Sequence, residues 1–245
     1  MFEKLAGRKI LITGAASGMG RDIACLFASE GAALALLDRN EAGVRAVADD
    51  LGAVAFGCDV TDRMTLGAII TAAAQALGGL DGLVNAAGIL DIVPFADLSA
   101  ESWDRMLAVN ATGPFNVVKA ALPFLSANES ATIVNIASVS ALMPMAGTTG
   151  YSASKAALTM FTKCLAFDLG PAIRANSICP GVIKTEMTRY LWENAEHTAR
   201  AADRVALKRL GETEDVARAA LFLSCGDSAF TTGIEIPVDG GFSWR

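Results

Sequence analysis

Tyr151 and Lys155 lie four residues apart in the segment YSASK, in a chain with only two tyrosines. On a helix over residues 151–169, the two side chains would share a face about one turn apart. A free phenol, with a pKa of about 10, is a poor base at neutral pH, but a neighbouring ammonium group lowers that pKa by stabilising the phenolate. Such a phenol could accept a proton from an alcohol or donate one to a carbonyl. Because this spacing also occurs on ordinary helices, its meaning depends on the rest of the chain.

A glycine-rich stretch, TGAASGMG, follows the first expected strand at residues 9–13. Gly14 would permit a tight exit from the strand, Gly18 would let the backbone approach a pyrophosphate, and Gly20 would let the next helix pack closely on the sheet. The spacing differs from the G-x-G-x-x-G fingerprint but meets the same physical needs. A glycine-rich turn that binds nothing is the alternative.

Asp38 would end the second expected strand, where an acid can accept hydrogen bonds from an adenosine ribose. Its charge would also repel a 2′-phosphate, which favours NAD over NADP as the cofactor. The adjacent Arg39 could bind that phosphate instead, or it could be solvated or lie over the adenine. Asp59 and Val60 could contact the adenine ring, and residues 85–88, NAAG, would bring small side chains to the same edge of the sheet.

Short apolar runs alternate with longer helical patterns along the chain. This alternation predicts an α/β fold with a doubly wound, mostly parallel, seven-stranded Rossmann-type sheet and helices on both faces. No linker or repeat interrupts it, so we expect one domain over residues 1–245, with a lid-like segment at about 182–212. The expected strands are 9–13, 32–38, 53–59, 81–86, 131–138, 173–179 and 234–239, and the expected helices lie near 18–30, 41–51, 62–77, 101–125, 151–169 and 213–225.

Composition narrows the classes of function. A hydrophobic fraction of 53% with 19% charged residues fits a sheet buried on both faces, and no apolar run is long enough to predict a membrane span. No secretory signal is visible, and five cysteines without a C-x-x-C pair are typical of reduced thiols in the cytoplasm. The single His197 argues against a histidine metal site, and a net charge of −6 without a basic tract disfavours nucleic-acid binding. We therefore expect a cytoplasmic protein with no metal, membrane or nucleic-acid partner.

Several short motifs follow one another along the chain: TGAASGMG, NAAG, Asn110 in LAVNATGPF, Ser138 in NIAS, YSASK and PGVIKT. Together they closely resemble the short-chain dehydrogenase/reductase family, of its shorter single-domain type, and the resemblance covers essentially the whole chain. It implies an NAD(H)-dependent oxidoreductase that transfers a hydride between nicotinamide and a secondary alcohol or ketone. Ala86, where a second Asn is common, and IASVSA, in place of the usual serine–serine start, depart from the family pattern without removing a reacting group.

The resemblance implies a role for each residue of the site. Tyr151 would be the acid/base, and Lys155 would lower its pKa and bind the nicotinamide ribose. Ser138 would hydrogen-bond the substrate oxygen, Asn110 would hold a water in a proton relay reaching Lys155, and Thr185 would bind the nicotinamide carboxamide. The expected cofactor-binding residues are Gly14, Ser17, Gly18, Met19, Gly20, Asp38, Arg39, Asp59, Val60, Asn85, Ala86, Ala87, Gly88, Tyr151, Lys155, Pro180, Gly181, Val182, Ile183 and Thr185, and the expected substrate contacts are Ser138, Leu90, Met143, Met145, Met187, Tyr190 and Trp192.

Three of these assignments have simpler alternatives. Ser140 would share a strand face with Ser138, so parity alone does not separate the two. Asn110 could serve only to satisfy backbone groups in a kinked helix. Thr185 could serve only to cap a following helix.

Alternative functions also follow from the sequence. One is a dinucleotide-binding regulator without turnover, another is epimerisation or elimination through a transient ketone, and a third is a 3-oxoacyl carrier-protein reductase that uses NADP. Asp38 and the acidic segment SANES at 126–130 make the last less expected. The resemblance implies a homotetramer that acts on a small molecule, with helices 101–125 and 151–169 at one interface and the C-terminal strand near another. Trp244 could reach a neighbouring subunit.

Overall fold

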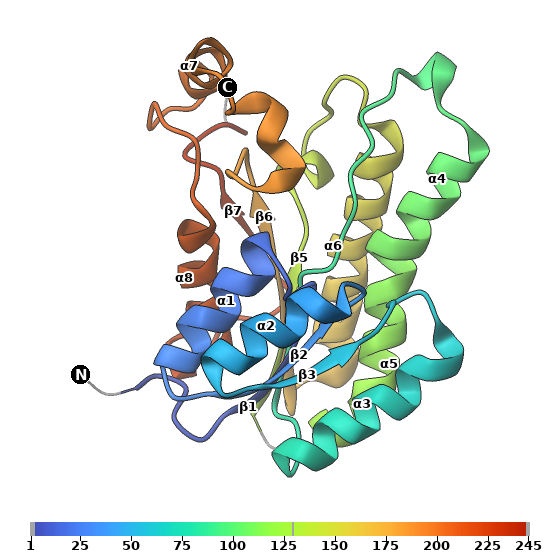
Figure 1. Ribbon diagram of the computed structural model, residues 1–245, viewed down its shortest axis with the longest axis vertical. Helices are drawn as coiled ribbons and strands as arrows, with labels where there is room; N and C mark the ends of the chain where they lie inside the picture. The colour runs from blue at the N-terminus through green and yellow to red at the C-terminus, as the bar shows by residue number, and fades with distance from the viewer. Residues whose placement is uncertain (1–2, 129, 244–245) are drawn as a thin grey trace.

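Seven parallel strands form one sheet in the order β3-β2-β1-β4-β5-β6-β7 (Figure 1). The structure is a computed structural model that describes residues 3–128 and 130–243, so Trp244 lies outside the described residues. The predicted α/β class is confirmed, and every pairing in the sheet is parallel. The strands are β1 (Lys9–Thr13), β2 (Ala33–Asp38), β3 (Val54–Gly57), β4 (Gly82–Asn85), β5 (Ala131–Ile136), β6 (Ile173–Pro180) and β7 (Glu235–Val238).

Helices cover both faces of this sheet, with α1, α2 and α8 on one face and α3, α5 and α6 on the other (Figure 1). Among the described residues, no helix combines the length and the apolar character needed to cross a bilayer. The helices are α1 (Gly18–Ser29), α2 (Glu41–Leu51), α3 (Arg63–Leu77), α4 (Ala100–Leu107), α5 (Gly113–Leu125), α6 (Thr149–Leu169), α7 (Ala195–Asp203) and α8 (Thr213–Ser224).

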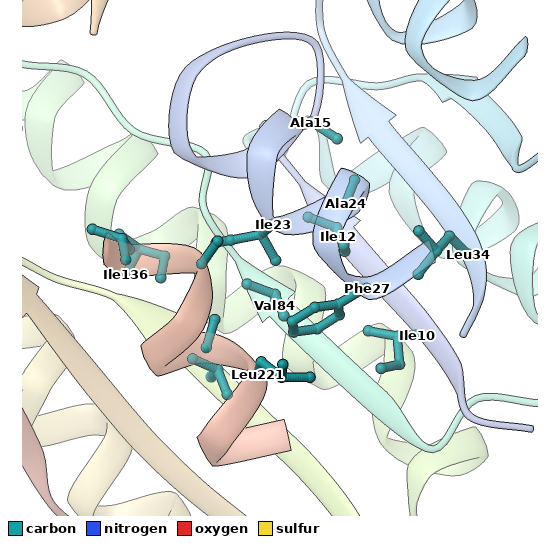
Figure 2. Packing of buried hydrophobic residues seen from close by; sticks show 14 of the residues in the cluster. Ile10, Ile12, Ala15, Ile23, Ala24, Phe27, Leu34, Val84, Ile136 and Leu221 are labelled. Carbon is teal, nitrogen blue, oxygen red and sulfur yellow. The ribbon is translucent and has the colours of Figure 1, made fainter. Parts of the chain in front are cut away.

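The core is divided into two layers by the sheet. Side chains alternate along β1, so that Ile10 and Ile12 pack with α1 and α8 while Leu11 packs with α3 and α5. Figure 2 shows the first layer, where Phe27 of α1 lies near Val84 of β4. Burial of both faces accounts for the high apolar content of the chain.

The strand order sets the position of the site. From β1 the chain runs outward to β2 and β3, then returns to place β4 on the other side of β1. The connections that leave the carboxyl ends of β1 and β4 therefore diverge to opposite faces, and ligands of open α/β sheets bind in the crevice that opens at such a point.

The expected helix at 101–125 is interrupted in the structure. A π-helical segment, Ala108–Thr112, separates α4 from α5. Pro114 stands at the start of α5, and it cannot donate a backbone hydrogen bond to the preceding turn. The wider turn carries Asn110 into the interior, where its side chain is fully buried.

The lid-like segment at 182–212 contains a 3-10 turn, Glu186–Leu191, followed by α7. Its two ends are tied together at the base. The amide of Gly211 donates to Val182 O at 3.0 Å, and the amide of Lys184 donates to Gly211 O at 2.9 Å. The segment is thus a loop with fixed ends, and Figure 1 shows α7 beyond the carboxyl ends of the strands.

Candidate active site

A cleft of about 240 Å³ opens at the carboxyl edge of the sheet, where the connections after β1 to β4 meet residues 185–187. Most of the expected cofactor-binding residues line it. They are Gly14, Ser17, Gly18, Met19, Gly20, Asp38, Arg39, Asp59, Val60, Ala86, Ala87, Gly88 and Thr185. Leu37, Ile89, Val109, Glu186 and Met187 also line the cleft, although the sequence did not assign them to the cofactor.

Each glycine of the turn after β1 has a different structural role. Gly14 has a positive φ of 70°, and a Cβ there would lie 2.6 Å from the backbone nitrogen of Ala87, so the turns after β1 and β4 touch at this residue. A Cβ on Gly20 would overlap the carbonyl oxygen of Gly14, which keeps α1 close to the turn. Gly18, also at positive φ, begins α1, and a Cβ there would contact the Thr185 side chain at 3.5 Å.

The Asp38 carboxylate is held in place by backbone amides. Its Oδ2 accepts a hydrogen bond from the Ala16 amide at 3.1 Å, and its Oδ1 accepts one from the Asn40 amide at 2.8 Å. Arg39 is exposed, and within the described chain its guanidinium makes no hydrogen bond or ion pair. A fixed negative charge and a free positive charge therefore stand side by side at the rim of the cleft.

Several residues expected at the cofactor do not line this cleft. Asn85 points away from the cleft, because its side chain is 2% exposed and its Nδ2 donates to Asn135 Oδ1 at 2.8 Å. Lys155 is buried below the surface and lines neither cavity of the site. Tyr151 and residues 180–183 line a second, smaller cavity.

The second cavity has a volume of about 100 Å³ and adjoins the cleft, since Met19, Thr185 and Met187 line both. Of the expected substrate contacts, it is lined by Leu90, Ser138, Met145, Met187 and Tyr190. Two others fall outside it. Met143 packs against a small core around Cys179, and Trp192 donates from Nε1 to Thr185 O at 3.0 Å, which braces the lid.

Tyr151 lies in the first turn of α6 and faces this cavity. Burial raises the pKa of its phenol, and a hydrogen bond with the Ser138 side chain opposes that rise. The resulting pKa lies above the usual value, opposite to the lowering expected from Lys155, because desolvation is the larger effect. Ser138 Oγ also accepts a hydrogen bond from the Ser140 amide at 3.1 Å, whereas the Ser140 hydroxyl contacts Met145 Sδ at 3.2 Å. Ser138, and not Ser140, is therefore the serine bonded to the phenol.

Lys155 is 4% exposed, and its Nζ donates to the carbonyl oxygen of Ile136 at 2.9 Å. The same nitrogen lies 5.8 Å from the centre of the Tyr151 ring. Burial lowers the pKa of Lys155 to about 8, since an ammonium group loses solvation in the interior. The cation is thus close to the phenol and is itself near its titration point at mildly alkaline pH.

Asn110 bridges the loop after β4 and helix α6. Its Oδ1 accepts from the Ile89 amide at 2.9 Å, and its Nδ2 donates to Ile89 O at 2.9 Å and to Ser154 Oγ at 3.0 Å. It therefore satisfies backbone groups, as the simpler alternative proposed. A Cβ on Gly88 would lie 3.2 Å from Asn110 Oδ1 and 3.3 Å from Lys155 Nζ, so glycine at this position lets the backbone after β4 lie close to both groups.

Thr185 serves the lid and lines both cavities. It is the N-cap residue of the 3-10 turn Glu186–Leu191, and its amide donates to Thr188 Oγ1 at 3.1 Å. Capping and contact with a ligand are thus compatible at this residue. Among the described residues, no cluster of His, Cys, Asp and Glu is arranged to hold a metal.

The chain is similar to known proteins along nearly its whole length. The family model described as enoyl-(acyl carrier protein) reductase matches residues 14–243. The chain is 37% identical over 251 residues to 2,5-dichloro-2,5-cyclohexadiene-1,4-diol dehydrogenase of Sphingobium indicum, with 99% of each covered. It is 39% identical over 253 residues to 2-(S)-hydroxypropyl-CoM dehydrogenase 3 of Xanthobacter autotrophicus, again with 99% of each covered. A short-chain dehydrogenase/reductase of Brucella melitensis superimposes with a TM-score of 0.94 at 34% identity, covering 99% of both chains.

These similarities agree with the geometry of the site. The named relatives are dehydrogenases of alcohol groups, which favours a dinucleotide-dependent alcohol oxidoreductase over a regulator without turnover or a carrier-protein reductase. The chain belongs to the short-chain dehydrogenase/reductase family.

Proposed function

We propose that the protein is an NAD(H)-dependent oxidoreductase of secondary alcohols and ketones in which Tyr151 exchanges the proton. The observation that carries this proposal is the position of the Ser138–Tyr151 pair on a small cavity that adjoins the cleft. A bound nicotinamide supplies the two-electron step, by exchanging a hydride with the carbon that bears the oxygen.

The residues of the cleft fit a dinucleotide. The turn before α1 offers backbone amides at a helix N-terminus, and Ser17, its N-cap residue, does not use its side chain to cap the helix. Any side chain at Gly14 or Gly20 would collide with neighbouring backbone, so both positions need glycine to keep this turn close to the cleft. In our proposal the turn binds the pyrophosphate and Thr185 binds the nicotinamide carboxamide.

Asp38 supports NAD rather than NADP. Because two backbone amides fix its carboxylate, the side chain cannot easily swing away from a 2′-phosphate. Removing a phosphate from water beside this charge would be costly. In our proposal the carboxylate accepts hydrogen bonds from the adenosine ribose hydroxyls, while the exposed Arg39 remains in solvent or lies over the adenine.

The proton passes between the substrate oxygen and Tyr151. Ser138 donates a hydrogen bond to the same substrate oxygen and keeps it within reach of the phenol. Lys155, anchored to Ile136, binds the nicotinamide ribose and places a positive charge near the phenolate that forms. In our proposal Asn110 holds a water that relays the proton onward from Lys155.

We also infer a homotetramer in the cytoplasm. Large apolar side chains stand exposed on α5 and α6, where Phe115 is 45%, Met160 58% and Phe167 89% exposed. Phe230 and Ile234 are likewise exposed just before β7. A second copy of the chain would cover these groups, and light scattering at micromolar concentration measures the mass. All five cysteines are free thiols, which is typical of a reducing compartment.

The direct test is a panel of secondary alcohols and ketones, each assayed with NAD(H) and NADP(H) by nicotinamide absorbance. The relative from Sphingobium indicum is named for a cyclic diol, so cyclic and acyclic diols belong in the panel. We expect turnover with NAD(H), and we expect Tyr151→Phe to abolish it while NADH still binds, as measured by fluorescence. Full activity in Tyr151→Phe would refute the role of the phenol.

A further inference from the structure

We propose that the substrate is an uncharged molecule with a second oxygen on the carbon next to the reacting one, a vicinal diol or α-hydroxyketone, and that Tyr190 binds this second oxygen. The inference rests on the proposed function, because it concerns the same cavity. The inference adds a substrate class and a specificity residue to the proposed function.

The two tyrosines of the chain line one cavity, although they are far apart in sequence. Tyr151 enters from α6, and Tyr190 enters from the 3-10 turn of the lid. Tyr190 lies close enough to contribute to the raised pKa of Tyr151, so the phenols share one electrostatic environment. In the described chain the Tyr190 hydroxyl has no hydrogen-bond partner. Because Tyr190 is 43% exposed, this hydroxyl is accessible to solvent or to a ligand in the cavity.

The backbone around Tyr190 is braced. Its carbonyl oxygen lies 3.2 Å from His197 Nδ1, and the His197 amide donates to Asn194 Oδ1 at 2.9 Å. Two residues further on, Trp192 donates to Thr185 O. These contacts hold the lid turn against α7, so Tyr190 presents its hydroxyl from a supported position.

Within the described residues, the lining of this cavity contains no Asp, Glu, Lys, Arg or His. Its polar groups are hydroxyls: Ser138, Ser140, Thr148, Tyr151, Thr185, Thr188 and Tyr190. A carboxylate, sulfonate or phosphate on the substrate would lose water there and gain no opposite charge from these side chains, so a charged substrate should bind more weakly. Hydroxyl and carbonyl oxygens, in contrast, match hydroxyl donors and acceptors.

The size of the cavity points the same way. Its volume of about 100 Å³ equals three to four water molecules at about 30 Å³ each. It has room for a reacting carbon, its neighbour and their two oxygens, and it opens toward the cleft at Met19, Thr185 and Met187. The reacting oxygen would face Ser138 and Tyr151, and the second oxygen would face Tyr190.

Three small probes isolate each part of this inference. Propane-1,2-diol carries the second hydroxyl, butan-2-ol replaces that hydroxyl with a methyl group, and lactate replaces the hydroxymethyl group with a carboxylate. We expect kcat/KM with NAD to be about tenfold higher for the diol than for butan-2-ol, the effect of one good hydrogen bond, and to be lowest for lactate. Saturation-transfer NMR on the NADH-loaded protein, which cannot oxidise an alcohol, should give the same order of binding.

Tyr190→Phe removes only the hydroxyl. It should lower kcat/KM for the diol about tenfold and change that for butan-2-ol less than twofold. Arg189→Gln is the matched control, because it alters the adjacent lid residue and its ion pair with Glu186 without touching the cavity. Arg189→Gln should leave kcat/KM for both substrates unchanged.

The outcomes separate the two proposals. Turnover of butan-2-ol and the diol with equal efficiency, or an equal loss for both in Tyr190→Phe, would overturn the role of Tyr190 and leave the oxidoreductase intact. Preferred turnover of lactate would overturn the uncharged substrate class. If neither these alcohols nor a wider panel is oxidised with NAD or NADP, the proposed function itself fails, and this inference fails with it.

Discussion

The ammonium group of Lys155 is anchored to the Ile136 carbonyl at 2.9 Å, in a position where only 4% of the residue is exposed. This bond ties the positive charge of the site to the last residue of β5. It fixes the cation relative to Tyr151, whose ring centre is 5.8 Å away, instead of leaving it mobile on helix α6. The arrangement has a cost in stability that can be measured.

Lys155→Met should stabilise the fold at neutral pH while abolishing turnover. Burial lowers the Lys155 pKa from 10.5 to about 8, so the folded protein releases this proton at lower pH than the unfolded chain. Burial of the charged ammonium group therefore lowers the free energy of unfolding by its maximum amount below pH 8. This destabilisation decreases as the pH rises from about 8 to 10.5. It amounts to about 3 kcal/mol, and loss of the bond to Ile136 offsets about 1 kcal/mol.

Guanidinium unfolding at pH 7 and pH 10 measures this effect. We expect the free energy of unfolding of Lys155→Met to exceed that of the unmodified protein by about 2 kcal/mol at pH 7. At pH 10 the two free energies should be about equal. Lys163→Met on the same helix is the control, because Lys163 is 42% exposed and pairs with Glu235. A gain in Lys155→Met that is the same at both pH values would contradict the assigned cause.

The two directions of the reaction should respond differently to pH. Because the pKa of Tyr151 is raised, the phenol is protonated at neutral pH. Reduction, which uses the protonated phenol, should be almost constant between pH 6 and 7, where Lys155, with a pKa of about 8, remains largely charged. Oxidation needs the phenolate, so its kcat should rise by about tenfold per pH unit while the pH stays below the phenol pKa. An oxidation rate that is flat near pH 7 would instead indicate a phenol pKa lowered by Lys155.

Ser138 and Ser140 provide a matched pair of substitutions. Ser138→Ala removes the hydroxyl bonded to Tyr151 and should reduce kcat by about 100-fold, within the range for a lost group that positions a proton transfer. Ser140→Ala, which removes a hydroxyl that contacts Met145 and not Tyr151, should change kcat less than threefold. An equal decrease of kcat in the two variants would mean that a general disturbance of this loop causes the decrease, and not the loss of the Ser138 hydroxyl.

Asp38→Asn should shift the cofactor preference. The amide keeps one oxygen to accept a backbone hydrogen bond, and it removes the charge that opposes a 2′-phosphate. We expect the ratio of kcat/KM for NAD to that for NADP to fall by at least about tenfold, since a like-charge contact of about 1.4 kcal/mol corresponds to that factor. Adding Arg39→Gln to Asp38→Asn should remove part of the gain with NADP. No change in the ratio would place the 2′-position away from Asp38.

The sequence predicted the fold well where local pattern and tertiary structure agree. The run around Ile10 to Ile12 is apolar because both faces of β1 are buried, and Gly14 and Gly20 stand where a side chain would meet backbone. The expected helix at 101–125 matches the helical region in extent, but the sequence did not reveal the π-helical segment at Asn110, because the apolar pattern continues unbroken through it. A single wide turn of this kind leaves little trace in residue spacing.

The side-chain directions in the site were harder to predict. Asn85 ends β4 on the face that turns toward Asn135, and the motif NAAG does not reveal which face that is. Met143 and Met145 both pack against the same small core, but only Met145 also lines the second cavity, because the loop that carries them has no regular period. Phe242 reaches the same cavity from the C-terminal region, a contact that depends on tertiary folding and has no local signal.

The backbone hydrogen bonds among Val182, Lys184 and Gly211 separate a part of the chain that tolerates substitution from a part that does not. Upstream of them, the glycine turn and Asp38 are fixed by backbone contacts, so alterations there disturb the scaffold. Within the loop that they close, length and sequence can drift at small entropic cost, because both ends stay pinned. New substrate preferences can therefore evolve by exchange of the part of this loop that follows Thr185, while Ser138, Tyr151 and Lys155 are inherited unchanged.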